Sequence, residues 1–206
     1  MILFFDEDHT SVPCDEMCIK SIKDFVEKEE VISVKIEEGM DWNRIYRYLE
    51  DAHAIVLAAN VYMDSVSPRV LGFLEKVERA VIGGESIGGK FYAILYTDLY
   101  EGEQTSIAMA VLKNFCERAN ITWGRGLGIG GNNINTALRK KSLWERLHRN
   151  TTDFRLNFLY EHALFIREKI QGTDVYINPK EVSRGRYIRK MNHEIKKTNR
   201  VKIAQN

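Results

Sequence analysis

The central stretch of the sequence reads Ala54-Ile55-Val56-Leu57-Ala58-Ala59-Asn60. Six consecutive apolar residues leave no polar face, and a strand of that kind is expected at the middle of a parallel sheet that helices cover on both sides. The stretch is among the longest apolar runs in the chain, yet it is far shorter than the roughly 20 residues of a membrane span. It therefore predicts the buried central strand of an α/β protein.

The sequence before this stretch repeats a strand followed by a helix. Residues 2–5 are apolar and are closed by acids, and residues 14–30 carry apolar side chains at roughly helical spacing. Residues 31–36 are rich in β-branched residues, and a second helix is expected to begin after Asp41, which can serve as its N-cap.

The sequence after this stretch continues the alternation. Strands that alternate with helices form right-handed βαβ units in a parallel sheet. We therefore predict a doubly wound, five-stranded parallel sheet with helices on both faces, in a domain spanning residues 1–172, followed by a helical, basic C-terminal extension spanning residues 173–206. The further elements are expected at 70–81 (helix), 91–96 (strand), 107–119 (helix), 121–131 (a strand opening at 121–123 and running into a glycine-rich stretch), 136–171 (helix, interrupted near 150–153) and 175–177 (short strand).

Length and composition agree with one compact domain, because 206 residues with 44% hydrophobic and 29% charged residues can build a full core. The net charge of +1 hides an asymmetry. Residues 180–206 hold nine basic and two acidic residues, a net charge of +7, which leaves −6 for residues 1–179. A basic tail of this kind can contact nucleic acid, but a solvated or partner-packed amphipathic helix is the commoner explanation and the one we adopt.

The three cysteines are an odd number, which favours free thiols over a disulfide framework. Cys14 and Cys18 lie four apart and lack the two-residue gap of a zinc or redox pair, so no metal site is predicted. The N-terminus has no basic leader and turns acidic after five residues, which is unlike a signal peptide. We expect a cytoplasmic protein that does not bind membranes.

Ligands of an open parallel sheet bind at the carboxyl ends of its strands, near the point where the strand order reverses. Three segments of the chain follow such strand ends. They are residues 6–13, 60–68 and 97–105.

The segment after the central strand carries a family resemblance. The flavodoxin-like NAD(P)H-dependent FMN reductases have a Pro-x-Tyr turn at this place, then small residues, a second proline and a helix of the form x-x-Lys-x-Phe-x-Asp-Arg. Tyr62, Pro68 and Phe73-Leu74 stand at matching positions, whereas Asn60 replaces the first proline and Glu75-Lys76 the Asp-Arg pair. The chain resembles this family along nearly its whole length, including a fourth strand at 90–96, a cysteine-bearing helix, the sequence Trp123-Gly124-x-Gly126-x-Gly128-x-Gly130-Gly131, and residues 175–179 followed by a basic segment.

The resemblance implies an FMN that lies across the three segments, with its phosphate in the first and its ring against the second and third. NAD(P)H would be the electron donor, a small molecule or a protein the acceptor, and the protein a homodimer. The flavin performs the chemistry, so no catalytic acid or base is required. The residues implied to contact the cofactor are His9, Thr10, Ser11, Asn60, Val61, Tyr62, Met63, Thr97, Asp98 and Gly102.

One departure from the family keeps a second hypothesis open. The first segment reads Asp6-Glu7-Asp8-His9-Thr10-Ser11-Val12-Pro13, without glycine and with several acids that would repel a phosphate. Thr10 or Ser11 can equally serve as a helix cap. The alternative is therefore a flavodoxin-fold protein that has lost FMN and acts as a binding or regulatory module.

Other patterns are interpreted as structural. Gly126-Leu127-Gly128-Ile129-Gly130-Gly131 has the letters of a dinucleotide-binding fingerprint but not its place after the first strand, so we interpret it as a flexible exit of the fifth strand. Tyr100 is interpreted as a surface aromatic. Four histidines without a nucleophile partner are interpreted as ordinary structural residues: His53, His148, His162 and His193.

Overall fold

The computed structural model describes residues 1–7, 24–26, 29–131, 154–180 and 182–203. Expectations that fall elsewhere, including the first helix over most of 14–30, the helical pattern before residue 154, Cys14, Cys18 and His148, lie outside the described residues. In chain order the elements are β1 (Ile2–Asp6), β2 (Val31–Lys35), α2 (Trp42–Asp51), β3 (Ala54–Tyr62), β4 (Ser65–Val66), α3 (Pro68–Ile82), β5 (Lys90–Tyr96), the 3₁₀ helix η1 (Gly102–Thr105), α4 (Ser106–Arg118), β6 (Thr122–Ile129), α7 (Phe154–Arg167), β7 (Val175–Ile177) and α8 (Arg184–Ile203).

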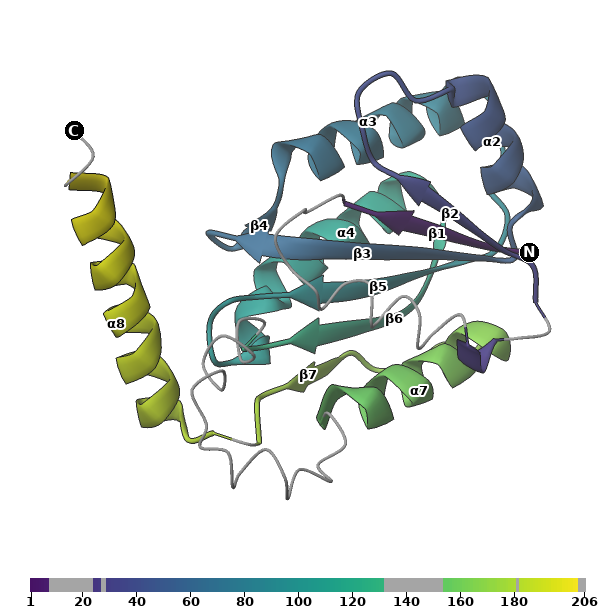
Figure 1. Cartoon of the computed structure of the whole chain (residues 1–206). Helices are drawn as coiled ribbons and strands as arrows, with labels where there is room; N and C mark the ends of the chain where they lie inside the picture. Colours follow the sequence, from purple (N-terminus) through teal and green to yellow (C-terminus); the bar gives the residue numbers. More distant parts are fainter. Residues whose placement is uncertain (8–23, 27–28, 132–153, 181, 204–206) are drawn as a thin grey trace.

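The strands form one sheet in the order β2-β1-β3-β5-β6-β7, and every neighbouring pair on this path is parallel. The predicted doubly wound parallel sheet is confirmed, with β3 near its centre (Figure 1). The predicted number of five strands is too low. The strand at 175–177, which we had assigned to the extension beyond residue 172, pairs with β6 and adds a sixth strand to the path, and β4 pairs antiparallel with the end of β3.

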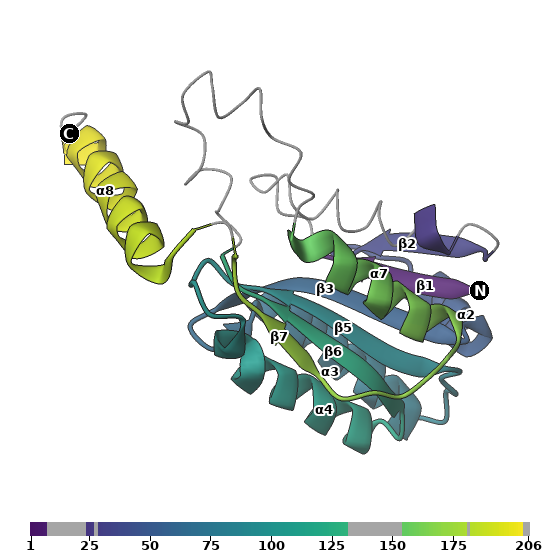
Figure 2. The same cartoon turned by 90° about the horizontal axis from the view of Figure 1, so that it is seen from below.

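Helices cover both faces of the sheet. Helices α2, α3 and α4 lie on one face and α7 on the other, as Figures 1 and 2 show from two directions. The side chains of β3 alternate between the two layers: Ile55 and Leu57 pack with the α2–α4 side, and Val56 and Ala58 with the α7 side. All four are at most 2% exposed, which accounts for the absence of a polar face in this part of the sequence.

The helix ends follow from local sequence. Asp41 caps α2 by accepting a hydrogen bond from the Arg44 N–H at 3.3 Å, as predicted. Ser67 caps α3 in the same way through the Val70 N–H at 3.2 Å, and Pro68 occupies the first turn, where its missing N–H costs nothing.

The glycine-rich stretch is strand as far as Ile129, so our interpretation of it as a flexible exit is wrong for these residues. Gly126 and Gly128 lie within β6. A Cβ at Gly126 would lie 2.3 Å from Met109 Sδ of α4, and one at Gly128 would lie 2.2 Å from Thr105 Oγ1 and 2.6 Å from the Tyr176 ring. Close packing of η1 and β7 on the strand favours glycine at Gly128, whereas at Gly126 the nearest neighbour is the flexible end of Met109.

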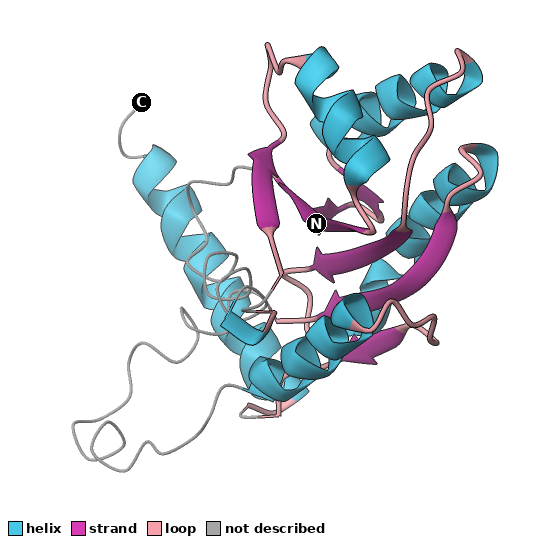
Figure 3. Cartoon of the chain, turned by 90° about the vertical axis from the view of Figure 1, so that its right-hand side faces the viewer, coloured by secondary structure: helices cyan, strands magenta, loops and turns pink. Residues whose placement is uncertain are grey.

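Helix α8 rises from the body as a separate arm (Figures 1 and 3). It begins seven residues after β7 ends and carries the basic residues of the C-terminal segment except Lys180. Among the residues that the structure describes, no helix combines the length and the apolar character that a membrane crossing would need.

His162 of α7 is buried among apolar groups, 1% exposed, with its ring edge-on to Tyr92 at 6.0 Å between centroids. Among the described residues, neither ring nitrogen has a hydrogen-bond partner. Burial, and secondarily the charge of Arg125, lowers the pKa of His162 from 6.5 to about 3. The folded protein therefore holds this imidazole neutral.

The buried imidazole makes stability depend on pH. Between pH 6.5 and 3 the unfolded chain binds a proton that the folded chain does not, so the free energy of unfolding falls as the pH falls through this range. We expect His162→Leu to reduce the loss measured by urea unfolding between pH 7 and pH 5 by about 2 kcal/mol. His193→Leu, at an exposed position of α8, is the control and should leave the loss unchanged. An equal loss in wild type and His162→Leu would contradict this account.

Candidate functional site

The carboxyl ends of the parallel strands meet at the edge of the sheet beside which α8 rises (Figure 1). Strand β1 ends at Asp6, which pairs with Ala58, and β3 continues four residues further to Tyr62. On its other side β3 runs beside β5, with Asn60 opposite Tyr96. The chain leaves β1 toward β2 on one side, and β3 lies on the other, so the reversal of strand order falls between β1 and β3.

The first strand-end segment is described only as far as Glu7. The Glu7 backbone N–H donates to the Ala58 carbonyl at 3.4 Å, and the residue is 3% exposed. His9, Thr10 and Ser11 lie outside the described residues. An acidic side chain is thus packed at the reversal point itself.

The second segment, which we expected to be a loop over 60–68, forms a β-hairpin. Val61 pairs with Val66 and Tyr62 with Ser65, because Met63 and Asp64 both adopt positive φ angles, 47° and 68°, and close a two-residue turn. Asn60 and Val61 are buried, whereas Tyr62 is 50% and Met63 99% exposed. The hairpin therefore presents two large apolar side chains at the edge where ligands bind in such sheets.

The third segment makes hydrogen bonds within itself and with the C-terminal segment. Thr97 is buried and its Oγ1 accepts from the Leu99 N–H at 3.2 Å, while Asp98 is exposed. Tyr100 is half-buried, not a free surface aromatic: its hydroxyl lies 2.9 Å from the Pro179 carbonyl and 3.1 Å from that of Val182.

Gly102 packs against β6 and β7. Its N–H donates to Asn178 Oδ1 at 2.8 Å, and a Cβ here would lie 2.5 Å from the Ile177 carbonyl oxygen and 2.7 Å from that of Gly128. The residue allows η1, β6 and β7 to pack closely. Nothing in the sequence near Gly102 indicates this contact, because its partners lie 26 and 75 or more positions away.

A cavity of about 480 Å³ opens at the same edge but on the far side of β1, between the β2–α2 connection and α3. Its floor includes Trp42 and Phe73, and Lys76 Nζ lies 4.9 Å from the centre of the Trp42 indole. Glu37 and Arg69 belong to its wall. Of the residues that we predicted to bind a cofactor, none of those that the structure describes lines this cavity.

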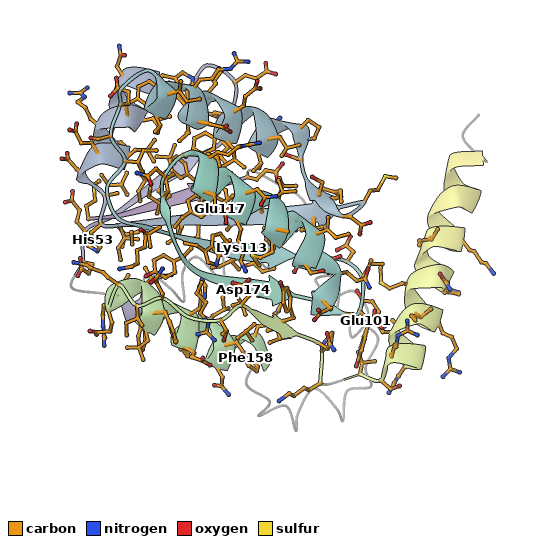
Figure 4. All side chains as sticks on the ribbon, turned by 180° about the vertical axis from the view of Figure 1, so that it is seen from behind. His53, Glu101, Lys113, Glu117, Phe158 and Asp174 are labelled. Carbon is orange, nitrogen blue, oxygen red and sulfur yellow. The ribbon has the colours of Figure 1, made fainter. Side chains whose placement is uncertain are left out.

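Charged side chains also lie along β6, where they join the strand to α7 and to the segment before β7. Arg125 Nη2 lies 2.7 Å from Glu161 Oε1 of α7, and Asp174 accepts from the Trp123 indole N–H at 3.0 Å and from the Gly126 N–H at 2.9 Å. Lys113 also pairs with Asp174, as Figure 4 shows. Within the described ranges, no three His, Cys, Asp or Glu side chains are grouped to hold a metal ion. Burial raises the pKa of the Cys116 thiol to about 12, which makes it unreactive.

Comparisons with known proteins show which solved structures share this architecture. No protein-family model matches the sequence, and no curated protein does. Solved structures do match: a flavodoxin of Streptococcus pneumonia TIGR4 superposes with a TM-score of 0.55 at 10% identity, over 82% of this chain and 99% of its own. An NADPH-quinone reductase from P. pentosaceus gives 0.53 at 12% identity, over 80% and 95%. A flavone reductase gives 0.56 at 10% identity, over 84% of this chain and 66% of its own.

The chain has a flavodoxin-like fold. The order of its first five parallel strands, β2-β1-β3-β5-β6, is the flavodoxin-like order, in which FMN binds where β1 and β3 diverge.

The described residues at this edge fit the ring of a flavin better than its phosphate. Tyr62 and Met63 of the hairpin and Leu99 of the neighbouring segment are exposed apolar side chains that follow adjacent strands. A flat aromatic ring laid on them would remove apolar surface from water. At the phosphate end, the described group is the buried carboxylate of Glu7, which would repel a dianion.

Gly102 provides a direct test of how the third segment is held. We expect Gly102→Ala to lower the free energy of unfolding by about 2 kcal/mol, because the added methyl group would meet two backbone carbonyls that cannot move independently. Urea denaturation measures the change. Gly72→Ala in α3 is the matched control: its Cβ would meet nothing within 4 Å, so it should stabilise the protein by about 0.4–1 kcal/mol. Equal effects of the two substitutions would contradict the packing described for Gly102.

Proposed function

We propose that this protein is an FMN-binding oxidoreductase that takes electrons from NAD(P)H and passes them to a flavin-, quinone- or protein-type acceptor. The observation that carries the proposal is the hairpin at the end of β3, which presents Tyr62 and Met63 at the divergence of β1 and β3. The reductase names of two structures with this fold support the direction of the proposal. We expect the protein to act in the cytoplasm as a homodimer.

The roles of the chain's own residues are to bind and orient. Tyr62 and Met63 would cover one part of the ring, and the segment that begins at Thr97 would border another. Buried Asn60 lies at the start of the hairpin and would orient it. Bound FMN supplies hydride and electron transfer, and the protein adjusts its potential through nearby dipoles and charges. No side chain is required to act as an acid or a base.

The second candidate is a flavodoxin-fold protein that has lost FMN and serves as a binding or regulatory module. Glu7 is the specific observation that favours this second candidate. The residue is 3% exposed and lies where β1 and β3 diverge, so its carboxylate would repel a phosphate bound there. The two candidates differ in one measurable property, which is affinity for FMN.

A visible absorption spectrum of freshly purified protein, followed by titration of FMN fluorescence, tests the first candidate. We expect flavin absorbance or saturable quenching, and bleaching of the bound flavin when NADH or NADPH is added without oxygen. A colourless preparation that does not quench added FMN would overturn the proposal and favour the second candidate. If neither NADH nor NADPH reduces the bound flavin, the proposal of FMN binding stands and the proposal of NAD(P)H as electron donor is rejected.

Glu7 can be tested with two ligands that differ only in the phosphate. We expect Glu7→Gln to tighten FMN binding about fivefold, because removing a carboxylate near the phosphate removes a repulsion on the order of 1 kcal/mol. Riboflavin, which lacks the phosphate, should bind wild type and variant equally. Glu85→Gln, at an exposed position after α3, is the control and should change neither affinity. Equal gains for FMN and riboflavin would show that Glu7 does not face the phosphate.

A further inference from the structure

The C-terminal segment and the third strand-end segment bind each other. Three elements contribute to the contact: residues 97–102 after β5, residues 178–182 after β7, and the first two turns of α8. Figure 4 shows Glu101 of the third segment at the foot of α8. These parts are about 80 positions apart in the sequence, so only the fold brings them together.

Tyr187 of α8 is the centre of this contact. Its side chain is 2% exposed, although it belongs to a helix that otherwise rises into solvent. Its hydroxyl donates to the Asp98 carbonyl at 2.6 Å, and its ring lies 5.7 Å from that of Tyr100 between centroids. Val182 is buried with it, and Met191 packs against the pair.

Further hydrogen bonds and an ion pair join the third segment to the C-terminal segment. The Tyr100 hydroxyl reaches the Pro179 and Val182 carbonyls, and the Gly102 N–H donates to Asn178 Oδ1. Arg184, at the start of α8, pairs with Glu101. This ion pair is partly exposed and adds little stability, whereas the Tyr187 bond is buried and more costly to lose.

We propose that the C-terminal extension is part of the cofactor site, and that Tyr187 positions residues 97–101 to receive the flavin ring. The inference rests on the proposed function, since it concerns the same site. A loop that is already held in its binding conformation loses less conformational freedom when a ligand binds, and affinity rises accordingly. Tyr187 acts through the Asp98 carbonyl and the Tyr100 ring, so its role is that of a positioning residue.

The test compares wild type with Tyr187→Phe, which removes one hydroxyl and keeps the buried ring. We expect the Kd for FMN, from fluorescence quenching, to rise three- to tenfold, as for the loss of one buried hydrogen bond. The loss of this buried bond should also lower the midpoint of thermal unfolding, so both proteins are compared at a temperature at which each is fully folded. Tyr160→Phe is the matched control, since Tyr160 is 39% exposed on α7 and contacts Phe25 rather than the third segment.

Hydrogen exchange in the absence of FMN distinguishes positioning from direct contact with the ring. We expect the amides of residues 97–102 to exchange faster in Tyr187→Phe, with β3 and β5 unchanged. Unchanged exchange there, or an unchanged Kd in a variant whose wild type binds FMN, would overturn the inference and leave the proposed function standing. A wild type that binds no FMN would overturn the proposed function, and this inference with it.

Discussion

The architecture depends on β3 being paired on both edges and covered on both faces. Its register with β1 and with β5 is continuous from Ala54 onward, and its side chains fill the core toward α2–α4 on one side and α7 on the other. Such a strand has one low-energy register, because any slip of one residue exchanges its two faces. The ends of β1 and β5 are then positioned relative to β3, and so are the segments that follow them.

A second constraint lies at the other side of the sheet, where β6 is built from alternating glycines. Gly126 and Gly128 let Met109 of α4 and Tyr176 of β7 pack directly on the strand. Because β6 presents little side-chain bulk on this side, β7 can pair with it. The residues that follow β7, Asn178 and Pro179, then contact the segment after β5. The contact between the C-terminal extension and residues 97–102 therefore depends on the glycines of β6.

The candidate site combines features that local sequence predicts with features that it does not. The strand-end position of Tyr62 follows from the apolar run before it, and so does its place at a ligand-binding edge. The hairpin does not follow, because its turn needs a positive φ at Met63, which is uncommon for such a residue, and because it depends on the pairing of Tyr62 with Ser65. The burial of Tyr100 and Tyr187 depends on segments about 80 positions apart, so no local pattern could indicate it.

The sequence by itself determined the alternation of strands and helices, the central place of residues 54–59, the cap at Asp41, and the division into an acidic body and a basic tail. These properties depend on the side chains of near neighbours, whose spacing can be examined directly. Only the tertiary structure decided that the glycine stretch is a strand, that β7 joins the sheet, and that Tyr187 reaches the Asp98 carbonyl. The physical reason is that close backbone approach and long-range hydrogen bonds depend on where distant segments lie in space.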